Sequence, residues 1–370
     1  MYSREAMVAR RNSLREALPG DVRILYAVKA NPHPELLSLM GELYDGFDVS
    51  SLGEIRKALD AGVSAARLSF AGPGKLREEL DFAVGAGVGS ISVESRDEIE
   101  AVRDICRCQG RMANIMVRVN PIFSLAQSGM GMGGPRQFGI DADQVPPVLD
   151  DIRGDRHLNF QGIHVFSGSQ NLSAAVLAEH FANIVRYALD ICAEKGMPLA
   201  AVNAGGGFGI PYFAGDTDLD LGAVGTAIGA TIAEEKARLG KTTITLELGR
   251  YLVGECGVYL CRVLYRKVSQ GTVFLVLDGG MHHHLAASGN LGQGLRRRPM
   301  PVVTANDLDG AGEKVTLVGP LCTPLDTFGT VEIPRADVGD LVAVMNSGAY
   351  GLSASPVNFL SRRPPVEALV

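Results

Sequence analysis

The most constraining feature of this sequence is a regular alternation of short β-branched segments with longer amphipathic segments between residues 24 and 250. Eight of the short segments have the composition of strands, and each is followed by a helical pattern or a long connection. Eight such units over about 225 residues are typical of a (β/α)8 barrel, because doubly wound sheets usually stop at about five to seven strands. We therefore predict an α/β fold of this kind, with strands at 24–30, 46–50, 67–71, 90–94, 114–120, 161–167, 199–204 and 242–248.

The pattern changes after residue 250. Short strand-like segments recur between Gly and Pro turns without a helical period, at 257–265, 272–277, 315–318 and 341–345. We predict two domains, a barrel over residues 1–250 and a C-terminal all-β sandwich or barrel over residues 251–370. The residues before the first predicted strand have the pattern of a charged amphipathic helix.

Composition excludes several classes of protein. Hydrophobic residues make up 46% of the chain and charged residues 21%, which is enough apolar material for a packed core. The net charge is −6 and the one dense basic cluster is Arg296–Arg298, so we predict no nucleic-acid partner. No apolar run reaches the roughly 18 residues of a membrane span, and no secretory signal is recognisable, so we expect a cytoplasmic protein. The six cysteines include no C-x-x-C pair, and no disulfide scaffold is predicted.

Polar residues and glycines stand at the predicted strand ends, which meet at one rim of such a barrel and carry its chemistry. Lys29 ends the first strand in apolar surroundings, where burial would disfavour its charged form. Three successive glycines follow the seventh strand, and barrels commonly bind phosphate at the loops after the seventh and eighth strands. The candidates at this rim are Lys29, Asp48, Glu54, His164, Ser167, Gly205, Gly206, Gly207, Glu247 and Arg250.

The lysine and the glycine run together suggest a phosphorylated cofactor bound as a lysine Schiff base, and pyridoxal 5′-phosphate fits that description. Glu247 would then face the pyridine nitrogen and keep it protonated, and His164 offers a flat ring for stacking. Each feature also has a plain structural interpretation: a surface lysine, the glycines of a tight turn, and a hydrogen-bonded core histidine.

Seven motifs, in order along the chain, resemble those of the fold-type III pyridoxal-phosphate decarboxylases, which include diaminopimelate, ornithine and arginine decarboxylases. The resemblance implies an alanine racemase-like barrel, a pyridoxal 5′-phosphate cofactor and a carboxy-lyase reaction; decarboxylation rests on the resemblance alone. The motifs are YAVKAN (26–31), GFDVSSLGE (46–54), HVFSGSQ (164–170), GGGFG (205–209), ELGR (247–250), GPLCTPLD (319–326) and NSGAYG (346–351).

The resemblance also implies roles for individual residues. Lys29 would form the Schiff base, His164 would stack on the ring, and Glu247 would meet the pyridine nitrogen. A homodimer with composite sites is implied, in which Cys322 acts on the substrate in the partner subunit's site and returns a proton after CO2 leaves. The other cofactor-binding residues would be Asp48, Ser167, Gly205, Gly206, Gly207, Gly249, Arg250 and Tyr350.

Two departures from the family pattern concern the substrate. Thr323 follows Cys322 where the diamino-acid enzymes have an acid, so a distal ammonium group loses its expected counter-charge. The stretch DGGMHHHLAASGN (278–290) resembles the subgroup associated with exosortase systems and relatives that decarboxylate aminoacyl groups on a carrier protein. Arg296–Arg298 could dock an acidic carrier protein, although a solvated loop is an equal interpretation. Candidate substrate-binding residues are Arg250, His283, Cys322, Thr323 and Asp326.

Other interpretations stay open. Three adjacent histidines invite a metal site, but we predict none, because consecutive residues of a strand point to opposite faces. The enzyme could decarboxylate a free diamino acid, or it could be a racemase of the same fold, although a racemase is expected to have an arginine where this chain has Glu247. A non-catalytic regulator or carrier-protein binding module is the remaining alternative.

Overall fold

The computed structural model describes residues 1–121, 130–131, 135–166, 168–213, 215–289, 300–304, 306 and 310–370. Its contacts divide the chain into two compact units. The first, called here the barrel unit, comprises Ala9–Gly209 and Leu219–Gly249. The second, called here the β unit, comprises Met1–Val8, Ile210–Asp218 and Arg250–Val370.

The barrel unit is built on eight parallel strands that close into a ring. Neighbours in the chain are neighbours in space, β11 pairs with β1, and the β4–β5 pairing completes the circle. The predicted (β/α)8 barrel is confirmed. The strands are β1 (Arg23–Ala27), β2 (Gly46–Val49), β3 (Leu68–Phe70), β4 (Ser90–Val93), β5 (Ala113–Asn120), β8 (Leu158–His164), β10 (Ala201–Asn203) and β11 (Thr243–Leu248).

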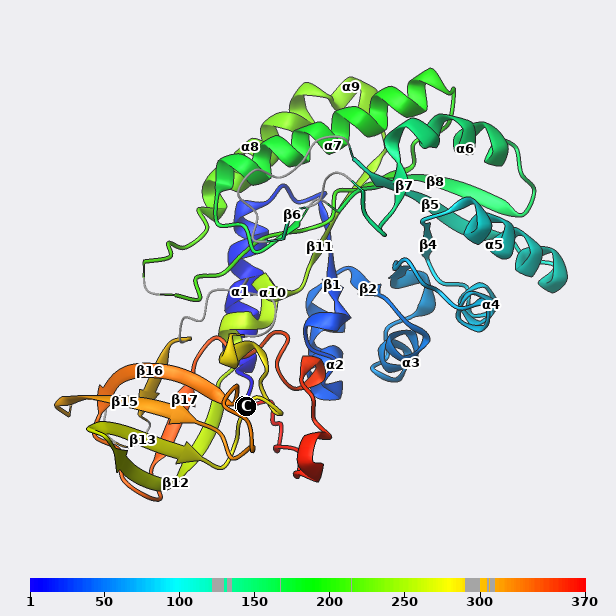
Figure 1. The fold of residues 1–370 in the computed structure, drawn as a ribbon. Helices are drawn as coiled ribbons and strands as arrows, with labels where there is room; N and C mark the ends of the chain where they lie inside the picture. The colour runs from blue at the N-terminus through cyan, green and yellow to red at the C-terminus, as the bar shows by residue number, and fades with distance from the viewer. Residues whose placement is uncertain are drawn as a thin grey trace. The chain divides into compact units, whose positions relative to one another are not determined.

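Helices lie around the outside of these strands (Figure 1). Local sequence signals begin and end them: in α5, Ser95 accepts a hydrogen bond from the Glu98 backbone N–H, and Gly110 ends the helix in the left-handed conformation. The buried face of α5 carries Ile99, Val102 and Cys106, the period of an amphipathic helix. The helices of the barrel unit are α2 (Pro34–Leu43), α3 (Leu52–Asp60), α4 (Arg77–Ala86), α5 (Arg96–Gln109), α6 (Val145–Ile152), α7 (Ala174–Glu194), α8 (Leu221–Glu234) and α9 (Lys236–Leu239). Helix α1 (Arg4–Ala17) has residues in both units, and α10 (Arg250–Val253) belongs to the β unit.

The β unit holds one six-stranded sheet in the order β14-β17-β12-β13-β15-β16, which confirms an all-β second part. Sequence patterns predicted four of these strands and missed β14 and β16. In β16 the pattern is interrupted by Gly329 at φ +94° and ends at Pro334, so it does not read as a strand. The strands are β12 (Tyr259–Ser269), β13 (Thr272–Leu277), β14 (Val302–Thr304), β15 (Gly312–Val318), β16 (Thr327–Pro334) and β17 (Leu341–Val344).

Short pairings complete the described structure. In the barrel unit, β7 (Ile140–Asp141) pairs with β5, and β6 (Met130–Gly131) pairs with β9 (Gly168–Ser169). In the β unit, the backbone of Tyr2 bridges to Gly257 and Leu369. Among the described residues, no helix has the length and hydropathy needed to cross a membrane.

Candidate active site

The carboxyl ends of the barrel strands surround a cavity of about 360 Å³. Four of the residues predicted from the sequence line it: Lys29, Asp48, His164 and Glu247. Strand pairing brings them together, because Ala27 lies opposite Asp48, and Glu247 lies opposite Leu25. The structure therefore gathers side chains that are more than 200 residues apart in sequence.

Lys29 is held at the edge of this cavity by a short turn. Strand β1 ends at Ala27, and Val28–Ala30 form a single 3-10 turn. The buried Tyr26 hydroxyl donates a hydrogen bond to the Asn31 carbonyl just after this turn, at 2.9 Å. The expected burial of Lys29 was wrong: its side chain is 45% exposed, because the turn directs it toward the cavity and away from the apolar strand. The Lys29 amine therefore lies at the cavity, where a ligand can reach it.

Asp48 is the ion-pair partner of Lys29. Its Oδ2 lies 2.6 Å from Lys29 Nζ, while the Asp48 side chain is only 1% exposed. Burial raises the pKa of Asp48 and the nearby Glu247 charge raises it further, whereas Lys29 acts in the opposite direction. Asp48 therefore holds the lysine amine in place.

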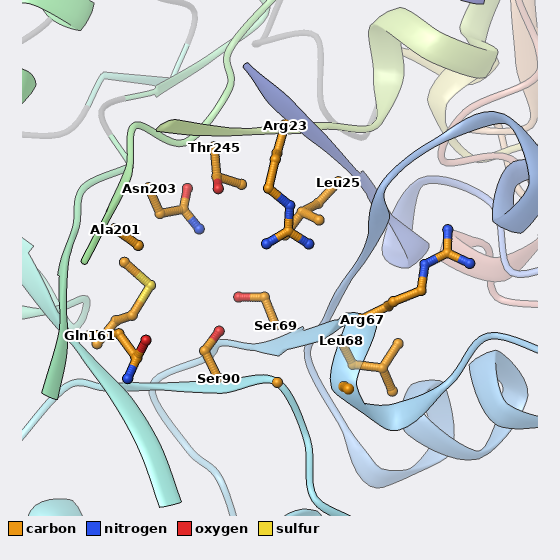
Figure 2. Close-up of a pocket in the computed structure, with 13 residues that line it drawn as sticks. Arg23, Leu25, Arg67, Leu68, Ser69, Ser90, Gln161, Ala201, Asn203 and Thr245 are labelled. Atoms are coloured by element: carbon orange, nitrogen blue, oxygen red, sulfur yellow. The ribbon is translucent and has the colours of Figure 1, made fainter. Parts of the chain in front are cut away.

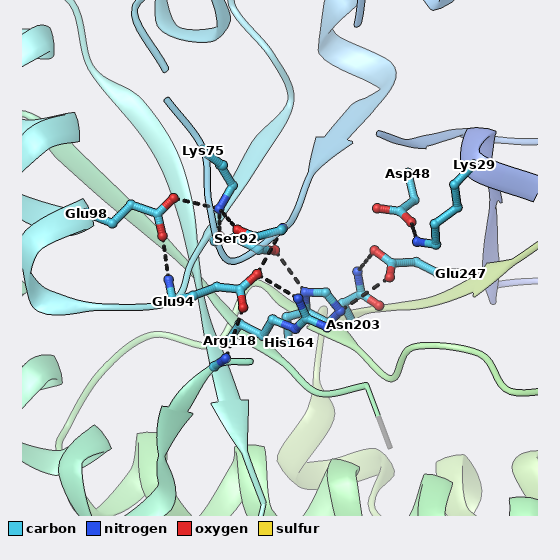
Figure 3. Close-up of polar contacts among 12 residues, drawn as sticks. Lys29, Asp48, Lys75, Ser92, Glu94, Glu98, Arg118, His164, Asn203 and Glu247 are labelled. Carbon is cyan, nitrogen blue, oxygen red and sulfur yellow. Dashed lines mark hydrogen bonds and ion pairs between the residues drawn. The ribbon is translucent and has the colours of Figure 1, made fainter. Parts of the chain in front are cut away.

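Glu247 is a buried carboxylate held in its ionised form. Asn203 donates from Nδ2 to Glu247 Oε1 at 2.5 Å, and His164 Nε2 lies 3.3 Å from Oε2 (Figure 3). Burial alone would raise its pKa, but His164, Lys29 and the Asn203 hydrogen bond outweigh this and lower the pKa to about 2. A permanent negative charge at this point suits a cationic nitrogen of a ligand.

The His164 ring is fixed from its other side. Its Nδ1 lies 2.9 Å from Ser92 Oγ, and the side chain is 1% exposed. Ser92 is on β4 and His164 ends β8, so two strands of the ring set the orientation of the imidazole. The ring is thereby positioned as a flat wall of the cavity.

The glycine run after β10 has no room for side chains. A Cβ on Gly206 would lie 1.9 Å from the Glu247 carbonyl oxygen, and Gly205 and Gly207 have φ of +64° and +97°. Gly249 is required by packing as well, since its Cβ would lie 2.9 Å from the Ala30 Cβ. Ser167, predicted as a phosphate contact, lies outside the described residues.

Sequence reasoning missed a polar network beside the cavity. Arg118 donates to Glu94 Oε1 at 2.6 Å, and Glu94 also accepts from the Gly72 and Gly139 backbone N–H groups. Lys75, buried at the same rim, donates to Glu98 and to the Ser92 carbonyl (Figure 3). Asn203, Ser92 and Arg118 all stand on the predicted strands, so polar residues within strands were the signal that could have found them.

The β unit contains two further predicted residues, which lie next to each other. The Arg250 guanidinium lies 4.7 Å from the Tyr350 ring centroid, and it donates to the Tyr212 hydroxyl at 2.8 Å. Tyr350 has φ +53°, a left-handed conformation that is unusual for an aromatic residue and is typical of functional segments.

The predicted substrate-binding segment of the β unit differs from expectation. Cys322 is exposed, as a reacting thiol requires. Asp326 is 2% exposed, and its two oxygens accept backbone N–H groups of Met281 and Leu321 at 2.7 and 2.8 Å. Thr323 Oγ1 accepts from the Leu325 N–H. Asp326 therefore braces its own loop, and we do not retain it as a substrate ligand.

The three adjacent histidines lie in a turn after β13, not on a strand as the metal argument assumed. His283 is 8% exposed, and its nitrogens lie 3.0 Å from the Tyr259 hydroxyl and 2.8 Å from the Arg363 carbonyl. These contacts occupy His283, so it too is not retained as a substrate ligand. In the described part of the chain, no three His, Cys, Asp or Glu side chains are arranged to hold a metal ion.

These residues fit pyridoxal 5′-phosphate. The cavity offers an accessible amine, a buried carboxylate and a flat imidazole, the groups that a Schiff-base cofactor with a pyridine ring requires. Residues 4–254 match the family model described as "Pyridoxal-dependent decarboxylase, pyridoxal binding domain". The chain belongs to this family of pyridoxal-dependent decarboxylases.

The sequences and structures of known decarboxylases match this chain over almost its whole length. It is 39% identical over 375 residues to L-glutamyl-[BtrI acyl-carrier protein] decarboxylase of Niallia circulans, covering 100% of this chain and 87% of the relative. It is 31% identical to a diaminopimelate decarboxylase of Thermoplasma acidophilum, covering 99% and 85%. The crystal structure of diaminopimelate decarboxylase from M. jannaschii matches with a TM-score of 0.91 at 26% identity, covering 100% of this chain and 86% of that one.

The enzyme is thus a pyridoxal-phosphate-dependent carboxy-lyase. All the relatives named here are decarboxylases, which sets aside the alternatives of a racemase and a non-catalytic regulator. The acid at position 247 agrees with this outcome, because a buried carboxylate, if it met the ring nitrogen, would keep the cofactor a strong electron acceptor.

Proposed function

We propose that this decarboxylase removes the α-carboxylate of an aminoacyl group that a carrier protein holds as a thioester. The observation that carries the proposal is the loop at residues 319–326, in which Thr323 replaces the expected acid and Asp326 is occupied by two backbone N–H groups. Asp326 is also only 2% exposed, so the loop offers no accessible carboxylate to a substrate with a distal ammonium group.

A thioester removes the need for that counter-charge. The far end of a tethered substrate is neutral, and burying a neutral group costs far less than burying an unpaired ammonium ion. Because the α-carboxylate must be free in order to leave, the tether must use a carboxyl group of the side chain. An L-glutamyl group has one, and the relative at 39% identity is named for an L-glutamyl carrier-protein substrate.

The residues of the barrel unit supply binding and electrostatics. Bound pyridoxal 5′-phosphate supplies an electron sink for the pair released when the carbon–carboxylate bond breaks. Lys29 would hold the cofactor covalently, Glu247 would keep its ring nitrogen protonated, and His164 would stack on its ring. Asp48 positions the Lys29 amine. The phosphate is assigned to Ser167, Gly205, Gly206 and Gly207, with Gly249 giving the close packing that this end of β11 needs.

We assign three residues of the β unit to the same reaction. Arg250 and Tyr350 contact the phosphate or the substrate. Cys322 belongs to the partner subunit's site in a homodimer, where its thiol delivers a proton to the α-carbon after CO2 has left. We assign the enzyme to the cytoplasm, with which six cysteines that form no disulfide bond are compatible. Arg296–Arg298, outside the described residues, is proposed as the docking site for the acidic carrier protein.

The decisive experiment compares substrates on one enzyme preparation. Purified enzyme, saturated with cofactor, is given L-glutamyl carrier-protein thioester, free L-glutamate, meso-diaminopimelate and L-ornithine, and CO2 release is followed for each. We expect release from the thioester, with kcat/KM at least about 100-fold above that for any free amino acid. Lys29→Ala is the inactive control. Efficient release from a free diamino acid would refute the argument from Thr323 and Asp326.

A further inference from the structure

The barrel has a second polar cavity, at the amino ends of its strands, that the proposed reaction does not use. Its volume is about 100 Å³, several times the roughly 10–15 Å³ that one water molecule requires. Arg23 and Ser90, the first residues of β1 and β4, line it together with Ser69 and Thr245. None of its 13 lining residues is acidic.

Arg23 brings an uncompensated positive charge to this cavity. Throughout the described part of the chain, its guanidinium has no ion pair and no hydrogen bond, and the residue is exposed. Arg67 also lines the cavity, but its guanidinium is turned away and donates to the backbone carbonyls of Gly41, Tyr44 and Asp45. The charge that faces the cavity is therefore that of Arg23 (Figure 2).

Ser69 brings a hydroxyl that the described protein leaves unsatisfied. The residue is 3% exposed, and its Oγ has no hydrogen-bond partner among the described residues. Figure 2 shows this hydroxyl directed into the same space as the Arg23 guanidinium. A buried hydroxyl without a partner costs free energy, so a ligand or water that accepts from it would be stabilised.

The cavity is linked to the active site through one residue. Asn203 lines it, and the same side chain donates to Glu247 and accepts from the Gly205 backbone N–H at 3.0 Å. A ligand in the cavity would therefore contact the residue that holds both Glu247 and the start of the glycine run.

We propose that this end of the barrel binds a small oxyanion, with Arg23 as its charge partner and Ser69 as a hydrogen-bond donor. Water could satisfy Ser69, but it would not neutralise Arg23. The neutral polar groups of Ser90, Thr245 and Asn203 complete a lining without a competing carboxylate. Inorganic phosphate and bicarbonate present the same charged oxygens, and both fit this chemistry.

Calorimetric titration of the holoenzyme with phosphate, and separately with bicarbonate, tests the proposal. The cofactor stays bound throughout, as its visible absorbance shows, so the glycine run is not available to the added anion. Sodium chloride keeps the ionic strength constant. We expect saturable one-to-one binding, with a thermal unfolding temperature that rises with anion concentration. The anion that binds more tightly, phosphate or bicarbonate, is then identified as the ligand of this cavity.

Two variants locate the site. Arg23→Gln should weaken binding at least about tenfold, and Ser69→Ala about three- to tenfold. Because the Ser69 hydroxyl has no partner, Ser69→Ala should not lower the unfolding temperature in the absence of the anion. Arg56→Gln is the matched control, since Arg56 is an exposed residue of α3 and its loss removes the same charge.

Three results would overturn the proposal: no saturable binding of either anion, unchanged affinity in Arg23→Gln, or an equal loss in Arg56→Gln. The last would show diffuse attraction to surface charge in place of a site.

Discussion

Replacing Glu247 with glutamine removes one charge and keeps the size of the side chain. The structure lowers the pKa of Glu247 from 4.5 to about 2. At about 1.4 kcal/mol per pH unit, this difference is a preference of about 3 kcal/mol for the carboxylate over the neutral acid. A glutamine carries no charge in the same surroundings, so the ring nitrogen of the cofactor would lose the anionic partner that we propose for it.

If the carboxylate stabilises the transition state by the same amount of free energy, its loss should lower kcat/KM for CO2 release about 10²-fold. The assay follows CO2 release from the preferred substrate at neutral pH, with cofactor saturation verified by absorbance. Glu234→Gln, at an exposed position of α8, is the matched control and should keep wild-type activity. A Glu247→Gln enzyme within about threefold of the wild-type rate would refute the electrostatic role argued for this residue.

The other predictions concern the thiol, the glycine run and the network beside the cavity. Cys322→Ala should leave the cofactor absorbance unchanged and slow product formation about 10²-fold or more, whereas Cys108→Ala, at the other exposed cysteine, should not; an unchanged rate would remove the thiol from the reaction. Gly206→Ala should lower both the unfolding temperature and cofactor retention, because its Cβ would meet the Glu247 carbonyl at 1.9 Å, while Gly20→Ala, in open space, should have little effect. The pKa of Glu94 is lowered from 4.5, because Arg118 outweighs the effect of burial, which acts to raise it. The Glu94 carboxylate therefore stabilises the fold above pH 4.5, and this stabilisation is lost as the pH falls through the pKa of Glu94 in the folded protein. Urea unfolding from about pH 3 to 6 should therefore show wild type and Glu94→Gln converging in stability below pH 4.5, and a constant difference would contradict this.

The barrel could be predicted because its signal is local. The strands of the ring are short, mostly buried segments, the helices between them carry apolar faces, and the count of eight selects the architecture. The strands β14 and β16 could not be predicted, because β14 spans only Val302–Thr304 and β16 is broken by Gly329. Such strands are stabilised by their partners β17 and β15, which are not visible to a local pattern.

Some residues of the site could be predicted from the sequence, and others could not. Lys29, His164 and Glu247 stand out because a lysine, a histidine and a glutamate at strand ends are costly unless they are used. Asn203 and Ser92 do not stand out, since a small polar residue is common in any strand. Their importance follows from distances to Glu247 and His164 that only a folded ring defines.

By itself the sequence determined the order of the elements, the residues able to carry the chemistry, and the run of three glycines after the seventh strand. Tertiary structure decided which of these residues act together. The β4–β5 and β1–β11 pairings close the ring, and only this closure joins residues 29 and 247 at one cavity. It also decided that Lys29 is accessible and that Asp326 is occupied, because exposure and hydrogen bonding depend on neighbours that are distant in the chain.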